Sequence, residues 1–320
     1  MVLNRRKFLK TGATAGVAAV LGSTTAALTG AAGLDRSATD AAPGSFDFVF
    51  FTDTHIQPEL DAAHGCDMCF HKIAGLKPDF AMMGGDHVFD ALGVDRTRAT
   101  MVYDLYKKTE QTLQMPLYHT IGNHDVFGVS TKSGMMTSDA GYGKKMYEDR
   151  VGRTYYSFGH KGWHFVVLDS IQPTEDREWQ ARIDDAQLAW LKQDLGRVGA
   201  MTPVIVTVHV PLVTAFLSYA ESVPKGQKYN TFTVDNAHEV LMAFEGHSVV
   251  AVLQGHLHIN EMVTLNNTQY LTGGAVCGNW WRGLRMGFPE GFTVVSARGR
   301  KITTRYETYG FKAVAGPEKP

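Results

Sequence analysis

The chain has 320 residues, of which 44% are hydrophobic and 20% are charged, so it is long enough to bury a large core. Its formal net charge of −1 excludes the strong basic excess of a nucleic-acid-binding surface. The three cysteines are too few for a disulfide-dense scaffold, and the Cys-x-x-Cys at 66–69 lacks the second pair of a four-cysteine zinc site. We interpret Cys66 and Cys69 as structural, either as free thiols or as a local disulfide, because a redox or metal role would need further context.

Residues 1–42 have the layout of an export signal and a short linker. Residues 4–10 carry four positive charges, and no charged residue occurs at 11–34. Arg5 and Arg6, followed by Phe-Leu-Lys, resemble a twin-arginine signal, a route that exports folded proteins. The stretch is weakly apolar for a membrane span, and a retained anchor is the alternative. We therefore predict an exported bacterial protein, periplasmic or extracellular, that meets the export machinery and keeps no stable membrane span after processing.

Strands and helices alternate in the first part of the mature chain. Residues 46–51 form an aromatic and β-branched run that predicts a buried strand, and the helix after it is closed by Lys-Pro at 77–78. In chain order we expect a strand at 46–51, a helix at 61–76, a strand at 80–83, a helix at 95–113 and a strand at 117–121.

The second part of the mature chain continues with shorter elements. In order we expect a loop with a short helix at 128–150, a hairpin of 155–158 and 163–168, a helix at 184–198, a strand at 203–208, a loop at 212–233, a helix at 235–244, a strand at 248–253 and short strands at 259–265, 268–272, 291–296 and 301–306. No internal repeat and no clear linker interrupts this series, so we predict one domain over 43–320 with C-terminal strands.

Polar side chains follow five of the predicted strands. They occur as Asp53-x-His55, Gly85-Asp86, Gly122-Asn123-His124-Asp125, His209 and Gly255-His256-x-His258. A turn or a helix cap explains any one of these groups as well as a function does. Five groups at strand ends, where the sites of α/β sheets assemble, indicate a metal site instead.

The residue types favour a pair of transition-metal ions. Alternate side chains of a strand share a face, so we expect Asp53 and His55 to reach one ion, and His256 and His258 to stand in the same relation. Mixed aspartate, asparagine and histidine donors suit Mn, Fe or Zn rather than Ca, and the absence of a nearby cysteine disfavours a structural zinc site. Seven candidate ligands are too many for one ion but suit two ions about 3.5–4 Å apart, an arrangement that hydrolyses phosphate esters.

In this order the five groups resemble the motifs of the calcineurin-like metallophosphoesterases. They are present as DTH, GGDH, GNHD, VHVP and GHLH, and they span residues 53–258. The resemblance implies an α/β fold, a four-layer sandwich of two mixed β-sheets flanked by helices. It also implies a metal-bridging hydroxide that attacks phosphorus in line, with two divalent or trivalent ions as cofactors.

The resemblance implies a role for each polar residue at the strand ends. One metal would be held by Asp53, His55 and His258. The other would be held by Asn123, His209 and His256, and Asp86 would bridge the two. His124 would protonate the leaving oxygen or stabilise its charge, and Asp125 would orient His124 through a hydrogen bond.

One position departs from the purple acid phosphatases of the same superfamily. Those enzymes carry a metal-binding tyrosine three residues after the bridging aspartate, where this chain has Phe89. We therefore expect the tyrosine–iron site to be absent and favour the general calcineurin-like type.

Weaker signals concern the substrate. Asn279, Trp280, Trp281 and Arg282 are candidate substrate contacts, because tryptophan rings stack on a base or an aryl group and arginine pairs with phosphate. The alternative is that the tryptophans pack against the edge of a sheet. His87 follows Asp86 directly and is a candidate substrate contact or a support for the metal ligands.

We therefore predict an exported metal-dependent phosphoesterase that acts on a small or medium phosphate ester. The aromatic pair and Arg282 favour diesters with an organic group slightly over monoesters. One alternative is a non-catalytic, metal-bearing binding protein at the cell surface, which would have lost a ligand or His124. Another is a hydrolase of pyrophosphate links in lipid precursors, which the export signal leaves open.

Overall fold

The computed structural model describes residues 43–220 and 228–316, and every element below belongs to the compact unit Asp40–Pro320. The predicted export signal at 1–42 lies outside the described residues. None of the helices in the described ranges is both long and apolar enough to cross a membrane.

The first sheet combines strands from the two ends of the mature chain. Its order is β13 (Lys301–Glu307), β12 (Phe292–Arg298), β1 (Phe46–Phe51), β2 (Phe80–Met83) and β3 (Leu117–His119). The strands β1, β2 and β3 are parallel, whereas β12 pairs antiparallel with β1. The carboxyl ends of the three parallel strands therefore meet at one edge.

The second sheet is built from the middle of the chain. Its order is β10 (Glu261–Leu265), β11 (Thr268–Thr272), β9 (Ser248–Gln254), β8 (Pro203–Val208), β5 (Trp163–Leu168) and β4 (Tyr156–His160). Its four central strands run parallel, and the hairpins β4–β5 and β10–β11 close its two sides antiparallel. A separate hairpin of β6 (Ile171–Pro173) and β7 (Trp179–Ala181) was not predicted from the sequence.

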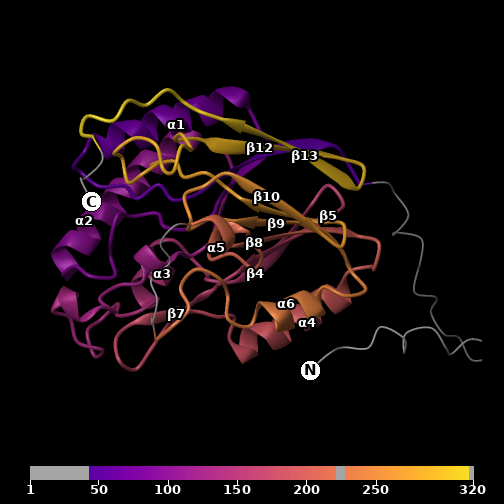
Figure 1. Ribbon diagram of the computed structural model, residues 1–320, viewed down its shortest axis with the longest axis horizontal. Helices are drawn as coiled ribbons and strands as arrows, with labels where there is room; N and C mark the ends of the chain where they lie inside the picture. The colour runs from indigo at the N-terminus through magenta and orange to yellow at the C-terminus, as the bar shows by residue number, and fades with distance from the viewer. Residues whose placement is uncertain (1–42, 221–227, 317–320) are drawn as a thin grey trace, which may run out of the picture. The chain divides into compact units, whose positions relative to one another are not determined.

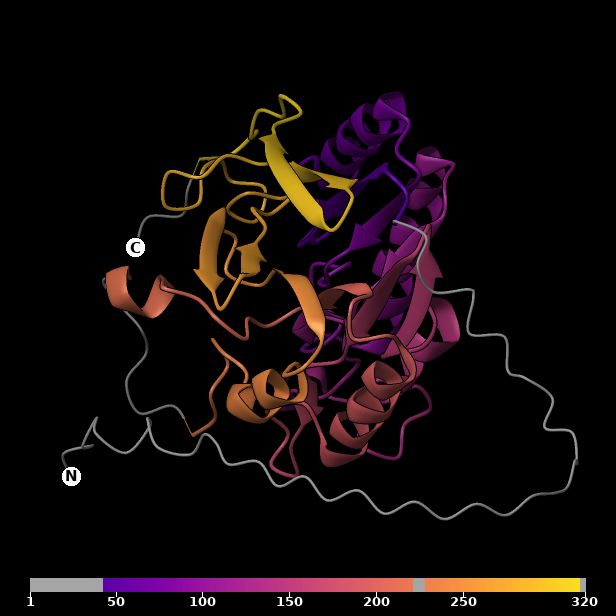
Figure 2. The ribbon, with the colours of Figure 1, turned by 90° about the vertical axis from the view of Figure 1, so that its right-hand side faces the viewer.

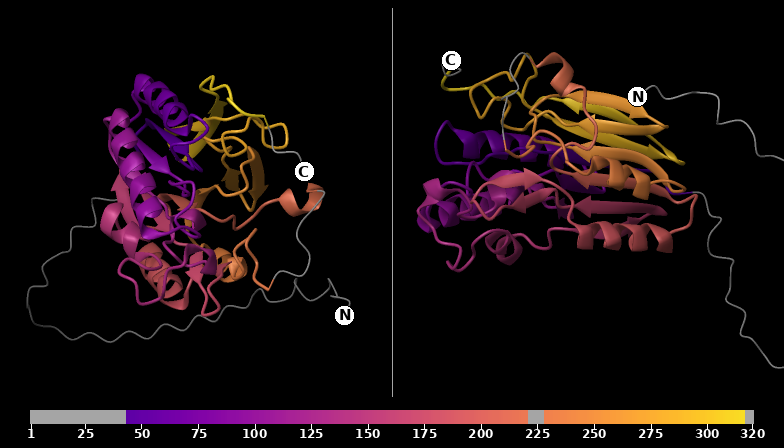
Figure 3. Two further views of the ribbon diagram at one scale, coloured as in Figure 1. Left: turned by 90° about the vertical axis from the view of Figure 1, so that its left-hand side faces the viewer. Right: turned by 60° about the horizontal axis from the view of Figure 1, so that its bottom comes forward.

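The α-helices of the described residues are α1 (Ala62–Leu76), α2 (Arg96–Thr109), α3 (Lys145–Arg150), α4 (Asp185–Arg197), α5 (Phe216–Tyr219) and α6 (Ala237–Ala243). Of these, α1 and α2 pack on the first sheet and α4 and α6 on the second, whereas Phe216 of α5 packs in a separate cluster with Leu257 and Ile259. In Figure 1, α1 lies above β12 and β13, while α4 and α6 lie below β8 and β9. Figure 2 shows the same order from the side, with the indigo α1 at the top and the orange α6 at the bottom, and the left panel of Figure 3 shows it from the opposite side.

An aromatic core lies between the two sheets. The ring of Phe48 stacks on Phe80 at 4.9 Å, and Phe165 of the second sheet meets both rings edge-on at 5.7 and 5.3 Å. The alternation within β1 explains the layering, because Phe48 and Phe50 face this core whereas Val49 and Phe51 pack towards α1. The predicted fold class, a four-layer sandwich of two mixed sheets flanked by helices, is confirmed.

Most predicted elements match the structure, with differences at their ends. The strand expected at 117–121 ends at His119, because the chain turns at Gly122 into a short 3-10 helix, Asn123–Asp125. The loop expected at 212–233 contains α5 within its described part. The helix expected at 235–244 begins after Asn236, whose side chain bonds to the backbone of Ile183 and does not cap the helix.

Trp281 fixes the contact between the C-terminal loops and α1. Its ring is completely buried, and its indole Nε1 donates to the carbonyls of Thr54 and His55 at 3.1 and 3.0 Å. Gly65 of α1 makes room for this ring, because a Cβ atom at residue 65 would overlap it. The absence of a side chain at Gly65 is therefore a packing requirement.

This packing predicts opposite effects for two substitutions in one helix. Gly65→Ala forces the ring of Trp281 to move and should lower the free energy of unfolding by about 1–3 kcal/mol. Gly75→Ala, also in α1, meets no atom within 4 Å and should raise it by up to about 0.5–1 kcal/mol through helix propensity. Urea unfolding of both variants measures the difference, and equal stabilities would contradict the packing argument.

Candidate metal centre

The seven candidate ligands lie at the carboxyl ends of parallel strands from both sheets. Asp53 and His55 follow β1, Asp86 follows β2, and Asn123 follows β3. From the second sheet, His209 follows β8, and His256 and His258 follow β9. The site is therefore assembled across the seam between the sheets.

The first cluster consists of Asp53, His55 and His258. Nε2 of His258 lies 3.2 Å from Oδ1 of Asp53 and 3.1 Å from Nε2 of His55, which is itself 3.8 Å from the same carboxylate oxygen. All three side chains are buried. Three donor atoms thus converge on one point, as they would around an ion.

The second cluster consists of Asp86, His209 and His256. Their donor atoms lie within 4.8 Å of one another, and Nε2 of His209 is 3.1 Å from Oδ2 of Asp86. The same oxygen of Asp86 lies 3.5 Å from Nε2 of His55, so Asp86 stands between the two clusters. The proximity of Asp86, His209 and His256 agrees with the family resemblance, whereas the place of Asn123 in this group and the binding of metal by these residues stay predictions.

The backbone at these ligands is left-handed rather than extended. Asp53, His55, Asp86, His256 and His258 have φ of 56°, 39°, 57°, 73° and 56°. Asp53 and His55 lie beyond the end of β1, so the strand alternation that we expected to align them is the wrong reason for their convergence. Backbone bonds from Asp53 to Gly85 and from His55 to Asp86 hold this strained segment, and such strain is concentrated at functional sites.

The donor set fits a metal site. Nδ1 of His209 donates to the carbonyl of Gly84 and Nδ1 of His258 to that of Gly278, both at 2.8 Å, so each ring has Nε2 left as a ligand atom. In the described part of the chain, Oδ1 of Asn123 is buried without a hydrogen-bond partner, whereas Nε2 of His209 faces the carboxylate of Asp86 at 3.1 Å. Buried polar atoms of this kind call for a ligand, and an ion would supply it.

The charges of the site are tightly coupled. Burial opposes ionisation of Asp86, but the positive charges of His209 and His124 hold the pKa of Asp86 well below its ordinary value. Burial disfavours a charge on His209, yet Asp86 raises the pKa of His209 to about 9. Burial and the charge on His209 lower the pKa of His256 to about 3. The two carboxylates therefore require positive charge beside them, which protons or metal ions can provide.

Asp125 does not contact the ring of His124. Its carboxylate accepts from the backbone N–H of Asp86, His87 and Gly122 at 2.9–3.0 Å and from Nδ1 of His87 at 2.8 Å. The carboxylate nearest to Nδ1 of His124 belongs to Asp90, at 3.8 Å. The predicted orienting bond from Asp125 to His124 is therefore wrong, and Asp125 instead fixes the loop that carries Asp86.

His87 does not face a substrate. Its ring is completely buried, with Nδ1 on Asp125 and Nε2 3.0 Å from Nδ1 of His119. Burial lowers the pKa of His119 well below its ordinary value, and the neighbouring His87 adds to this effect. The prediction of a substrate contact at His87 is wrong, whereas its alternative, a support for the metal ligands, agrees with its position beside Asp86.

The two adjacent tryptophans point in different directions. Trp281 is buried against α1, so its predicted contact with substrate is wrong and the packing alternative holds for this residue. The ring of Trp280 is half-buried and lies 4.6 Å from the ring of His258, beside the first cluster. Asn279 and Arg282 line the same cavity as Trp280, and Arg282 also bonds to the carbonyl of Gly316.

Two residues near the clusters were not expected. The ring of Trp179, in β7, meets that of His256 edge-on at 5.8 Å, and no local pattern in the sequence indicated this strand. Sγ of Cys277 lies 3.7 Å from Nδ1 of His258, so the expected absence of cysteine from the site is wrong. Cys277, Cys66 and Cys69 are buried free thiols, and burial raises the pKa of each.

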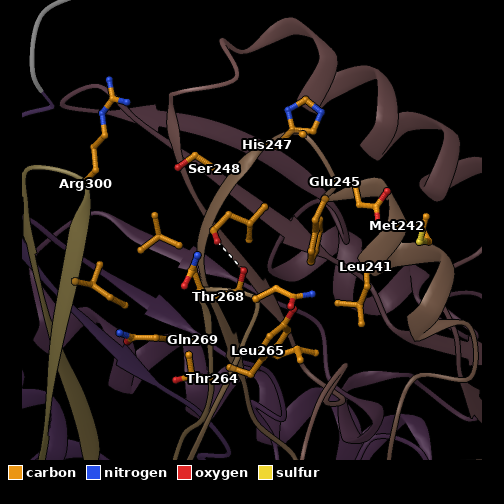
Figure 4. A pocket seen from close by; sticks show the side chains of 18 of the residues that line it. Leu241, Met242, Glu245, His247, Ser248, Thr264, Leu265, Thr268, Gln269 and Arg300 are labelled. Carbon is orange, nitrogen blue, oxygen red and sulfur yellow. Dashed lines mark hydrogen bonds between the residues drawn. The ribbon is translucent and has the colours of Figure 1, made fainter. Parts of the chain in front are cut away.

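Two cavities differ in their relation to the clusters. One of about 690 Å³ is lined by Gln57, Phe89 and Trp280 and adjoins the first cluster. A larger one of about 950 Å³ lies at the amino end of β9, between α6 and the β10–β11 hairpin. Figure 4 shows it with Leu241, Leu265 and Arg300 at its walls and the bond from Thr268 to the backbone of Val249. It is separated from the clusters by the length of β9, roughly 20 Å, so the smaller cavity is the one relevant to their chemistry.

The fold and the site agree with a family of known enzymes. The model of the calcineurin-like phosphoesterases matches residues 46–260, and the chain belongs to this family. It is a metal-dependent phosphoesterase. A relative, the serine/threonine-protein phosphatase CPPED1 of Bos taurus, is 28% identical over 234 residues, which cover 72% of this chain and 67% of the relative. The Rattus norvegicus protein of the same name is 27% identical over 72% of this chain and 68% of its own length.

Solved structures support the fold alone. A dimetal phosphatase from Danio rerio superposes with a TM-score of 0.56 at 16% identity, covering 81% of this chain and 98% of that one. A purple acid phosphatase from yellow lupin gives 0.53 at 13% identity, over 83% and 52% of the two chains. GAP50 of Plasmodium, described as an anchor in the inner membrane complex, gives 0.51 at 15% identity, over 83% and 85%.

The hydrogen bonds that the carboxylate of Asp125 accepts lead to a prediction for its replacement by asparagine. Asp125→Asn turns an amide NH₂ towards hydrogen-bond donors and should lower the free energy of unfolding by about 1–3 kcal/mol and the affinity for Mn²⁺ by about tenfold or more. Asp90→Asn, at the half-exposed neighbour of His124, should change stability by less than about 0.5 kcal/mol. Urea unfolding and calorimetric Mn²⁺ titration measure both, and a harmless Asp125→Asn would contradict the assigned contacts.

Proposed function

We propose that this chain hydrolyses phosphate esters with two bound transition-metal ions, Mn, Fe or Zn, and that it prefers diesters slightly over monoesters. One observation carries the proposal: two clusters of donor side chains adjoin across the seam of the sheets, and Asp86 of the second cluster lies 3.5 Å from His55 of the first. Asp53, His55 and His258 would hold one ion, and Asn123, His209 and His256 the other, with Asp86 between them. When bound, two such ions lower the pKa of a water molecule and neutralise the oxygens of the phosphate.

The residues of the chain supply orientation and a proton. His124 lies at the edge of the site, with its ring 4.7 Å from that of His55 and its side chain 28% exposed. It is therefore placed to reach a bound ester and to give a ring proton to the leaving oxygen. The carboxylate of Asp90 lies 3.8 Å from Nδ1 of His124, on the side of the ring where it would help to orient the imidazole. Asp125 would act on the metal ligands through the loop at Asp86 and His87.

The preference for diesters rests on the space beside the first cluster. A monoester leaves one organic group at the phosphate, whereas a diester leaves two, and the cavity of about 690 Å³ next to Trp280 has room for a second group. The relatives named serine/threonine-protein phosphatases make phosphoserine peptides a monoester to be compared. The twin-arginine-like sequence at residues 4–10 supports an exported protein that acts outside the cytoplasm.

Metal-dependent turnover tests the proposal. The protein, stripped of metal and reloaded with Mn²⁺, should bind two ions and hydrolyse bis-nitrophenyl phosphate somewhat faster than nitrophenyl phosphate. Asp86→Asn should abolish turnover together with metal binding, because both clusters lose a shared ligand. His124→Ala should lower kcat by about 10²–10⁴-fold at unchanged metal content. His71→Ala, on the exposed face of α1, is the matched control and should change neither.

Two results would contradict the proposal. One is a chain that holds two ions and hydrolyses neither nitrophenyl ester nor a phosphoserine peptide, which is the behaviour of a binding protein. The other is full activity in Asp86→Asn. A faster reaction with the monoester would overturn only the diester preference.

A further inference from the structure

A row of hydrogen bonds leads away from the candidate metal centre through two histidine rings. The carboxylate of Asp125 accepts from the backbone N–H of Asp86 at 3.0 Å and from Nδ1 of His87 at 2.8 Å. Nε2 of His87 lies 3.0 Å from Nδ1 of His119, the last residue of β3. We call Asp125, His87 and His119 the histidine row. It connects Asp86, a candidate ligand, to a residue that is not itself a candidate ligand.

The acceptor at one end of the histidine row fixes the direction of its bonds. An ionised carboxylate only accepts, so Asp125 requires the proton of His87 on Nδ1. In the neutral ring, Nε2 of His87 is then an acceptor, and Nδ1 of His119 has to carry the proton between them. The ring of His87 is completely buried, so without this donor its Nε2 would be left unpaired.

Tyr156 holds His119 in place from the second sheet. Its hydroxyl accepts from the backbone N–H of His119 at 2.8 Å and donates to the carbonyl of the same residue at 3.0 Å. Tyr156 belongs to β4 and His119 to β3, so these two bonds fix the end of the first sheet against the second. The ring of His87 is held by Tyr106 and Tyr147, which meet it edge-on at 4.8 and 5.6 Å.

The outer nitrogen of His119 faces a carboxylate that is already compensated. Nε2 of His119 lies 3.8 Å from Oε2 of Glu110, and Glu110 forms an ion pair with Lys107. With the proton on Nδ1, Nε2 of His119 presents a lone pair to Glu110, and the charge of Lys107 reduces the repulsion between them. The surroundings of His119 therefore allow the proton position that His87 needs.

We propose that His119 is a positioning residue for the phosphoesterase reaction, which acts through His87 and Asp125 on the loop that carries Asp86. The backbone of Asp86 is left-handed, with φ of 57°, and a conformation of this kind persists only where its surroundings fix it. Loss of the donor at His119 would weaken the bond from His87 to Asp125 and release this loop. The inference rests on the proposed function for the role of Asp86 and adds a residue outside the metal site.

Metal binding by two variants of His119 tests the donor. Nδ2 of asparagine and Nδ1 of histidine are the same number of bonds from the backbone, so His119→Asn keeps an N–H for His87, whereas His119→Leu does not. Calorimetric titration of the metal-free, full-length protein with Mn²⁺ should show about 10–100-fold weaker binding for His119→Leu and binding close to that of wild type for His119→Asn. His160→Leu, in β4 but bonded to Asp79, is the control and should bind like wild type.

A second measurement needs neither metal nor substrate. In the metal-free protein, the Nδ1 proton of His87 should give a slowly exchanging imidazole resonance in the NMR spectrum, which is assigned by its absence in His87→Gln. The resonance should persist in His119→Asn and exchange rapidly in His119→Leu. A histidine that only supports the fold would lower the stability of the metal-free protein and leave the Kd for Mn²⁺ and this resonance unchanged.

Three results would overturn the inference. They are wild-type affinity for Mn²⁺ in His119→Leu, an equal loss of affinity in the leucine and asparagine variants, and a His87 resonance that does not respond to His119→Leu. Wild-type protein that binds no Mn²⁺ would contradict the proposed function instead, and the resonance would still decide whether His119 supports the bond from His87 to Asp125.

Discussion

Two pairs of buried charges join the sheets at the point where the chemistry is placed. Asp86 of the first sheet meets His209 of the second at 3.1 Å, and Asp53 meets His258 at 3.2 Å. Burying a carboxylate away from water costs free energy unless a positive charge lies beside it. The first sheet supplies the carboxylates and the second sheet supplies the histidines that compensate them. Metal ions would satisfy the same requirement more strongly than protons do, because one ion is shared by several ligands. The position of one sheet against the other therefore decides whether the site exists.

The aromatic core sets that position, and a small number of hydrogen bonds transmits it to the ligands. Phe48, Phe80 and Phe165 hold the sheets together through stacked and edge-on contacts. Beyond the strands, five of the seven candidate ligands lie on left-handed backbone, and Asp125 and the indole of Trp281 bind the adjoining loops in addition to the backbone bonds of Asp53 and His55. The strain is local and the restraints are distant in sequence, which is how a rigid scaffold maintains an unfavourable conformation at a site.

The sequence predicts the strands and the ligands far better than it predicts the contacts behind them. β1, β2, β8 and β9 are apolar runs that end in conspicuous polar residues, and this information is local. The hydrogen-bond partner of Asp125 cannot be predicted from local sequence. His87 is 38 positions away, and only the fold shows that His87, and not His124, bonds to the carboxylate of Asp125. The strand β7, which contains Trp179, has only three residues and no alternating pattern, so its sequence does not indicate a strand. Trp280 and Trp281 are adjacent residues of the same type, and the sequence does not distinguish them. The backbone nevertheless directs Trp280 towards the first cluster and buries Trp281 against α1.

The fold by itself does not decide the activity, because one fold can carry different sites. In the function proposed here, activity would depend on the donors and on His124, all of which are present in this chain. Specificity has to come from elsewhere, because the ligands are buried and fixed by their mutual contacts. The groups free to distinguish substrates stand on the loops that leave the clusters, at Gln57, Phe89 and Trp280. Two of these positions are nevertheless tied to the ligands: Ile56 and Val88 form a parallel bridge, and the N–H of Phe89 donates to the carbonyl of Ile56. A change at Gln57 or Phe89 therefore also bears on the segments that carry His55 and Asp86, so substrate choice and metal binding are not independent in this fold.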